Sequence, residues 1–197
     1  MADVYTYEIG NKLYINMTNK CNNDCEFCIR NHGDGIEGYK LWLKKEPTVE
    51  EIKTELKDAE RYQEVVFCGF GEPLFRIDDL IEVAKFLKSK NIKTRINTNG
   101  QAELITKRKD TALRLKGLID TINISLNGID AKDYVKACRP REGEKAYYAM
   151  LDFTKECVKY IPEVIMSVVD VIGAEKIEKA KEIAESLGAK LRVREFI

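Results

Sequence analysis

The chain has 197 residues, of which 44% are apolar and 34% charged, and its 33 basic residues balance its 33 acidic ones. This length and composition predict a single folded domain over residues 1–197, without the global basic field that binds nucleic acid or an anionic membrane. No run approaches the ~18 apolar residues of a membrane span, and the N-terminus lacks the charged and apolar regions of a secretory signal. We therefore expect a cytoplasmic protein that does not associate with a membrane.

The first predicted element is a β-hairpin. Alternating apolar residues occupy positions 4–9 and 13–17, and Gly10-Asn11 separates the two stretches, which is typical of two paired strands. Residues 18–47 then show little periodicity and contain three closely spaced cysteines. A loop of about thirty residues is unusual in a compact domain, and such loops commonly carry function.

From residue 48 onward, helices and strands alternate. A capping box at Thr48 and Glu51 begins a helix that we expect to extend to residue 62. Apolar periodicity predicts further helices at residues 77–90, 102–118, 130–137, 144–160 and 174–187, and strands at residues 64–68, 92–96, 121–126, 164–169 and 191–197. With the strand at 13–17, these make six strands that alternate with helices, as in a parallel sheet.

The chain is too short for a closed eight-stranded barrel, which typically needs about 250 residues. Six units fit either an open, partial barrel or a doubly wound sheet, and in both architectures ligands bind at the C-terminal ends of the strands. Polar or glycine-rich segments follow five of the predicted strands, so we expect them to converge on one rim. These segments are the loop containing Cys21, residues 69–73, residues 97–100, residues 125–127 and Asp170.

Three of the six cysteines, Cys21, Cys25 and Cys28, lie within eight residues, whereas the other three are dispersed. This group has three alternative interpretations: unrelated cysteines, a zinc site completed by His32, or a [4Fe–4S] cluster. Zinc sites take four ligands, usually as two close pairs that are distant from each other. Electron-transfer clusters are held by four cysteines, so a three-cysteine cluster leaves one iron open to a ligand from outside the protein. The spacing and the position after a strand favour this last interpretation.

At these residues the sequence resembles the radical S-adenosylmethionine (SAM) enzymes. The segment from Cys21 to Cys28 matches the family's CxxxCxxC motif, with the aromatic Phe27 before the last cysteine. Residues 69–73, Gly-Phe-Gly-Glu-Pro, are similar to its GGEP motif with a phenylalanine at the first glycine, and residues 124–127 look like its ribose-binding segment. The resemblance covers nearly the whole chain and implies an α/β fold, a partial (βα)6 TIM-type barrel with an N-terminal hairpin.

The resemblance also implies the chemistry. The three cysteines would hold a [4Fe–4S] cluster, SAM would chelate the open iron, and reductive cleavage would give a 5′-deoxyadenosyl radical that abstracts hydrogen from a substrate. Glu72 would accept a hydrogen bond from the amino group of SAM, and Gly71 would let the backbone approach the cofactor. The other implied cofactor-binding residues are Phe27 at the adenine, Ser125 and Asn127 at the ribose, and Gly69, Asn99 and Asp170.

The substrate stays open at this stage. Residues 71–76 and 191–197 resemble the molybdenum-cofactor cyclase branch of the family, and residues 138–140 and the small size resemble minimal, TatD-associated radical SAM proteins. A peptide, an RNA and a nucleotide-like molecule are all compatible, and Arg192 and Arg194 share a face of the last strand that could meet an anionic one. The family chemistry further implies anaerobic conditions and a flavodoxin or ferredoxin as the reductant.

Residues 33–47 have two interpretations. Glycines and aromatic residues, Trp42 among them, are typical of a lid that excludes water from a radical, but Trp42 could equally anchor the loop on the barrel. Arg76 and Arg139 are either surface charges or anion ligands. A second functional class is a non-catalytic iron–sulfur or zinc module for binding or electron transfer. Glu72 argues against it, because a structural metal site needs no carboxylate at the end of the second strand.

Overall fold

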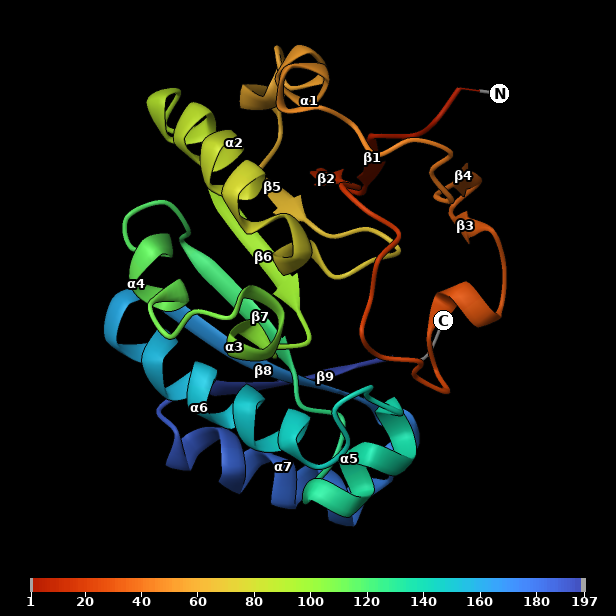
Figure 1. Ribbon diagram of the computed structural model, residues 1–197, viewed down its shortest axis with the longest axis vertical. Helices are drawn as coiled ribbons and strands as arrows, with labels where there is room; N and C mark the ends of the chain where they lie inside the picture. Colours follow the sequence, from red (N-terminus) through yellow and green to blue (C-terminus); the bar gives the residue numbers. More distant parts are fainter. Residues whose placement is uncertain (1, 196–197) are drawn as a thin grey trace.

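A seven-stranded sheet in the order β1-β2-β5-β6-β7-β8-β9 organises the protein, whose computed structural model describes residues 2–195 (Figure 1). The strands are β1 (Thr6–Ile9), β2 (Lys12–Ile15), β5 (Glu64–Phe67), β6 (Thr94–Thr98), β7 (Thr121–Ser125), β8 (Glu163–Val169) and β9 (Lys190–Arg194). Strand β1 pairs with β2 antiparallel, which confirms the hairpin, and every later neighbour is parallel. Because β2 and β9 are not paired with each other in the described chain, the curved sheet stays open, and the predicted partial barrel is confirmed.

Helices cover the outer side of this sheet, while residues 18–47 lie along its other side (Figure 1). They are α1 (Val49–Glu55), α2 (Ile77–Ser89), α3 (Ala102–Thr106), α4 (Thr111–Leu115), α5 (Ala131–Cys138), α6 (Lys145–Tyr160) and α7 (Ala174–Ser186). Alternate strand residues such as Ile15, Phe67 and Ile122 are fully buried against them and form the main core. None of the helices within residues 2–195 combines the length and hydropathy of a membrane span.

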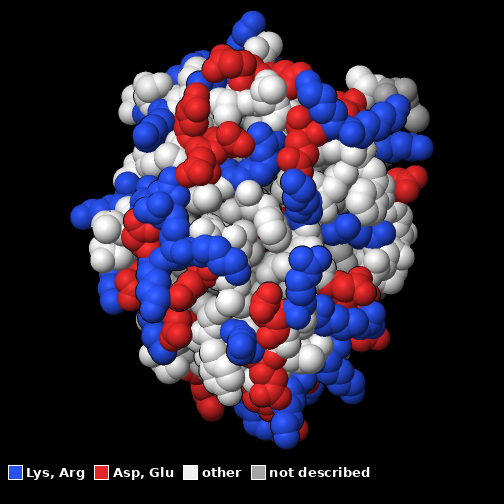
Figure 2. All heavy atoms as spheres, in the orientation of Figure 1, with Lys and Arg blue, Asp and Glu red and all other residues white. Residues whose placement is uncertain are grey.

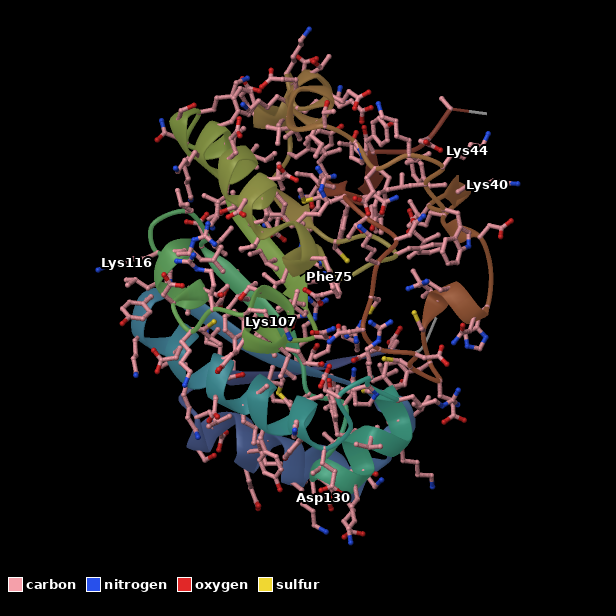
Figure 3. All side chains as sticks on the ribbon, viewed as in Figure 1. Lys40, Lys44, Phe75, Lys107, Lys116 and Asp130 are labelled. Carbon is pink, nitrogen blue, oxygen red and sulfur yellow. The ribbon has the colours of Figure 1, made fainter. Side chains whose placement is uncertain are left out.

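The opposite, concave face of the sheet is polar. Strand residues alternate between the two faces, so the residues between the core positions face inward. They include Tyr14 and Asn16, Cys68 just after β5, Arg95 and Asn97, Asn123 and Ser125, Ser167, and Arg192 and Arg194. On the face of the molecule that Figure 2 shows, charges of both signs are interspersed. Lys107 and Lys116 lie on the helical side of the molecule, and Lys40 and Lys44 at the opposite edge (Figure 3).

Two predicted helices are shorter than expected. The predicted capping box is confirmed, because Thr48 and Glu51 each accept the other's backbone N–H, but α1 ends at Glu55 and a 3₁₀ turn at Ala59–Arg61 follows. Residues 102–118 form two helices rather than one. Lys107 adopts a left-handed conformation (φ 59°) at the end of α3, and the Thr106 hydroxyl accepts the N–H of Arg108. This local bond competes with continuation of the helix.

The remaining differences concern boundaries. Strand β6 is displaced by two residues from the expected range, β7 ends at Ser125, and β9 covers Lys190–Arg194, so that Glu195 lies outside the strand. Residues 196–197 of the predicted last strand lie outside the described residues. The expected loop at 18–47 contains a small hairpin of β3 (Gly35–Ile36) and β4 (Tyr39–Lys40). Its turn has positive φ at both central residues, the geometry that two-residue hairpin turns prefer.

Candidate functional site

The cysteine loop follows β2 and docks on the C-terminus of α5. The N–H groups of Asp24 and Glu26 donate to the carbonyls of Cys138 and Ala137, at 3.1 and 3.0 Å. The last carbonyls of a helix have no partner within the helix, so the cysteine loop acts as the cap of α5. The backbone carbonyl of Asn22 accepts a hydrogen bond from the N–H of Arg141 at 2.9 Å. This bond extends the contact beyond the end of α5.

Two of the three cysteines share a cavity. Cys21 and Cys28 line a space of about 260 Å³ together with Arg30 and Trp42. The Cys25 thiol instead hydrogen-bonds with Cys138, which lowers the pKa of Cys25. Accordingly, no group of three His, Cys, Asp or Glu side chains in the described chain forms a ready-made ion site.

The donor set nevertheless fits an iron–sulfur cluster. All three cysteines are free and half-buried on one short loop, and thiolates are the soft ligands that such clusters need. Cys25 would exchange its Cys138 contact for iron. The zinc alternative is less favoured, because His32 lines a different cavity from that of Cys21 and Cys28 and its ring lies 3.4 Å from the Glu26 carbonyl. Burial, with a contribution from Glu72, raises the pKa of Cys21 to about 12, so the metal-free thiol is neutral.

A buried amide network holds the residues between the cysteines. The Asn99 amide donates to Asn22 Oδ1 at 2.8 Å, and Asn22 donates to Gln101 Oε1. The Gln101 amide donates to Asn23 Oδ1 at 2.7 Å and to the Tyr134 hydroxyl at 3.0 Å. Gln101 and Tyr134 are fully buried. Only Asn99 was singled out from the sequence. The paired asparagines inside the CxxxC spacing were the available signal for the other four, since two adjacent amides in a loop need partners.

Glu72 is a buried link between two strand ends. Its carboxylate accepts hydrogen bonds from the Thr98 hydroxyl at 2.7 Å and from the backbone N–H groups of Asn99 and Leu74, at 2.7 and 3.1 Å. Burial raises the pKa of Glu72 to about 7, against these bonds, which lower it. A carboxylate has about four acceptor positions, and the protein occupies three. The fourth acceptor position of the carboxylate could therefore take the amino group of SAM, and this contact remains a prediction.

The two predicted glycines are required by the protein's own chain. A Cβ at Gly69 would lie 2.1 Å from Asn16 Oδ1, and one at Gly71 would lie 2.4 Å from the carbonyl of Thr18. The turn after β5 thus packs closely against the segment that leads to Cys21, where the N–H of Glu72 donates to the backbone carbonyl of Lys20 at 2.8 Å. Close approach of the chain explains the glycines before any cofactor is considered.

Phe27 and Asn127 line a second cavity, of about 430 Å³, together with Val171, Ile172 and Lys176. Asn127 lies in a turn beyond β7 with φ 46°, so the alternation of strand residues does not extend from Ser125 to Asn127. Its buried Oδ1 has no hydrogen-bond partner in the described chain. Ser125 and the exposed Asp170 are not among the described residues that line this cavity.

The segment at residues 41–47 is anchored. Leu41 is fully buried, and its carbonyl accepts the Asn16 amide at 2.8 Å. Trp42 packs edge-to-face on Phe70, with the ring centroids 5.1 Å apart, and the Arg30 guanidinium lies over the Trp42 ring. These contacts favour the interpretation of Trp42 as an anchor, and they give the unexpected phenylalanine of residues 69–73 a structural role.

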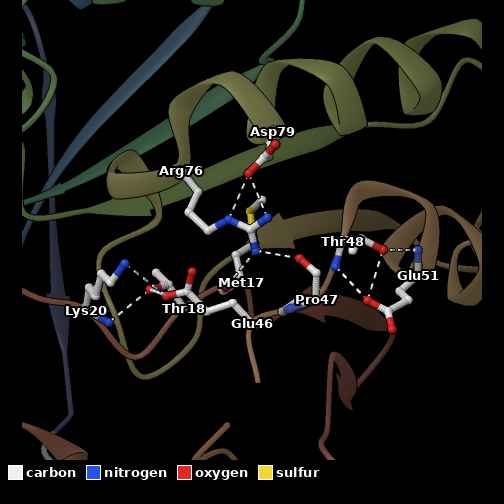
Figure 4. Close-up of polar contacts among 9 residues, drawn as sticks. All are labelled: Met17, Thr18, Lys20, Glu46, Pro47, Thr48, Glu51, Arg76 and Asp79. Carbon is white, nitrogen blue, oxygen red and sulfur yellow. Dashed lines mark hydrogen bonds and ion pairs between the residues drawn. The ribbon is translucent and has the colours of Figure 1, made fainter. Parts of the chain in front are cut away.

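Arg76 holds the C-terminal end of the same segment, at Pro47. Its guanidinium donates to the carbonyls of Met17 and Pro47, at 3.0 and 2.6 Å, and forms an ion pair with Asp79 (Figure 4). It is therefore a structural clamp rather than a free anion ligand. Arg139, the other candidate, is half-exposed and lies 3.8 Å from the Asp24 carboxylate, over the cysteine loop.

Comparisons with known proteins establish the family of this chain. The model of the radical SAM superfamily matches residues 15–187, and the chain belongs to that family of enzymes. It is 32% identical over 155 residues to a probable GTP 3′,8-cyclase of Thermococcus kodakarensis, covering 77% of this chain and 45% of that protein. A probable GTP 3′,8-cyclase of Methanocaldococcus jannaschii is 28% identical over 202 residues, covering all of this chain and 62% of its own length. The chain thus spans about half to two thirds of these relatives.

Solved structures show the same fold. The crystal structure of Streptococcus suis SuiB bound to S-adenosylmethionine superimposes with a TM-score of 0.74 at 20% identity, over 95% of this chain and 41% of that one. The structure of TYW1 with a lysine-pyruvate adduct bound gives a TM-score of 0.68 at 16% identity, over 95% and 65% of the two chains. At these identities the likeness concerns the fold alone.

Proposed function

We propose that this chain is the core of an enzyme that cleaves SAM reductively and uses the resulting 5′-deoxyadenosyl radical to abstract hydrogen from a substrate. A [4Fe–4S] cluster with one open iron would supply the electron and the chelation site for SAM. The observation that carries the proposal is the position of the cysteine loop. It follows the first parallel strand, next to one cavity lined by Cys21 and Cys28 and a second lined by Phe27 and Asn127.

The chain's own residues would bind and orient the cofactor across these two cavities. Phe27 precedes Cys28 directly and offers its ring to the adenine, and the unpartnered Asn127 Oδ1 can accept a ribose hydroxyl. The remaining acceptor position of Glu72 suits the amino group of SAM. Gly69, Asn99, Ser125 and Asp170 stay predicted contacts, and Asn99 would act by holding the cysteine loop.

The electron source and the substrate belong to the same proposal. A low-potential flavodoxin or ferredoxin would reduce the cluster. Among the three substrate classes, the GTP 3′,8-cyclase relatives support a nucleotide-like molecule, and a peptide or an RNA would be the alternatives. The competing class, a non-catalytic iron–sulfur or zinc module, does not account for the second cavity, which is lined by Phe27 and by Asn127 with its unpartnered oxygen.

Anaerobic reconstitution followed by reaction with SAM and a reductant tests the proposal. The protein should be brown and should form 5′-deoxyadenosine, detected by mass spectrometry. Alanine at Cys21, Cys25 or Cys28 should abolish both, whereas Cys157→Ala is a matched control, because Cys157 is buried on α6 away from the loop. A colourless zinc protein, or a cluster that never yields 5′-deoxyadenosine, would refute the proposal.

A further inference from the structure

Four polar side chains on the concave face of the sheet each have one buried atom without a hydrogen-bond partner in the described chain. Arg95 on β6, Asn123 on β7 and Ser167 on β8 are 7%, 5% and 0% exposed. Within residues 2–195, Arg95 Nε, Arg194 Nε, Ser167 Oγ and Asn123 Oδ1 have no hydrogen-bond partner. Buried polar groups are nearly always paired, so several unpaired groups on one face offer hydrogen-bonding positions to a polar ligand.

These groups converge on the inside of the barrel. Arg194 and Arg95 both lie within electrostatic range of the Cys68 thiol, and the Asn97 side chain lies next to that thiol. Asn97 is the register partner of Asn123 on the next strand. Side chains from β6, β7 and β9 therefore meet in front of Cys68, at the end of β5.

The charge at this place is not balanced. Glu64 is the carboxylate that pairs with Arg95, at 3.3 Å, and it also pairs with Lys12 at 2.7 Å. It is the first residue of β5, at the end of the strand opposite to the cysteine loop. In the part of the chain that the structure describes, Arg194 forms no ion pair, although it is the last residue of β9 and lies in electrostatic range of Cys25.

We propose that Arg194, with Arg95, Ser167 and Asn123, forms an oxyanion site inside the barrel that holds a phosphate or carboxylate group of the substrate. Arginine suits this task, because its fork of N–H donors matches the oxygens of either group. The Asn123 oxygen accepts a hydroxyl or amine next to the anionic group. The assignment to the substrate rests on the proposed function, since the site faces the cysteine loop from within the barrel.

Calorimetric titration of the reconstituted protein with inorganic pyrophosphate and, separately, citrate tests the site with SAM present. The wild type should bind one of them saturably; pyrophosphate indicates a phosphorylated substrate and citrate a carboxylate. Arg194→Gln should weaken that binding about tenfold or more, because a charge-assisted pair of bonds is lost. The affinity of the Arg194→Lys protein should lie between that of the wild type and that of the Arg194→Gln protein. Asn123→Asp should weaken binding similarly by placing a negative charge of the same shape beside the ligand.

Arg108→Gln is the matched control, because it removes one positive charge that pairs with Asp110 on the outer surface. No saturable binding to the wild type, or an equal loss in the control, would overturn the proposal. So would an Arg194→Gln protein that loses SAM affinity but keeps its oxyanion affinity, since the arginine would then hold the carboxylate of SAM. Arginine-dependent binding in a wild type that forms no 5′-deoxyadenosine would confirm the site and overturn its assignment to a radical substrate.

Discussion

Replacing Gln101 by alanine tests whether the amide network holds the cysteine loop. Gln101 is fully buried, and its amide joins Asn22, Asn23 and Tyr134 through three hydrogen bonds. The Tyr134 hydroxyl would keep Asn23 as a neighbour, and the two half-buried asparagines would be within reach of water. With about 1 kcal/mol for each lost bond, and more where a partner stays unsatisfied, we expect the free energy of unfolding to fall by about 2–4 kcal/mol.

Urea denaturation of the metal-free protein measures this change, and iron content after anaerobic reconstitution and gel filtration measures its effect on the site. Gln63→Ala is the matched control, because Gln63 is exposed and surface substitutions usually stay within about 0.5 kcal/mol. The Gln101 variant should also retain less iron than the control. If it matches the control in both stability and iron content, the network does not position the loop, and this reasoning is wrong.

Three further predictions concern Glu72, Gly71 and Trp42. Burial raises the pKa of Glu72 to about 7 from its ordinary 4.5, so the folded protein holds this proton more tightly than the unfolded chain. The group therefore makes stability fall by about 3 kcal/mol as the pH rises from 4.5 to 7; Glu72→Gln should remove this slope in urea denaturation, and an unaltered slope would contradict the shift. Gly71→Ala would place a Cβ 2.4 Å from a backbone oxygen, whereas Gly33 faces open space. We expect a loss of about 2 kcal/mol or more at Gly71 and none at Gly33, and equal melting temperatures would disprove the close approach. Trp42→Ala should cost about 1–2 kcal/mol through its contacts with Phe70 and Arg30; a negligible loss would restore the lid interpretation.

The sequence predicted the order of elements well because each element carries its own periodicity. The hairpin, the six parallel strands and the helices all lie where apolar residues repeat with the expected period. Two of the errors arose where one residue changes the backbone. Nothing in the periodicity of residues 102–118 indicates that Lys107 adopts a left-handed conformation, and the turn at Asn127 is equally local.

The site was predictable only where its chemistry is local. The three cysteines lie within eight residues of one another, and their spacing indicated the family. Two of the three partners of Glu72, Thr98 and Asn99, are 26 and 27 residues away, so its role as a link between strand ends could not be predicted without the fold. The same holds for Arg76, whose carbonyl partners lie on two other segments.

The docking of the cysteine loop on α5 sets an order of events during synthesis. The loop emerges early, but Asn23 and its partner Tyr134 are 111 residues apart, and the backbone contacts reach Arg141. Contacts of such long sequence separation form late, because the chain between them must close first. A nascent chain that ends before α5 therefore has all three cysteines but none of the contacts to α5 that position them. Cluster insertion should accordingly act on a nearly complete domain, and delivery to the growing chain would meet a loop without defined geometry.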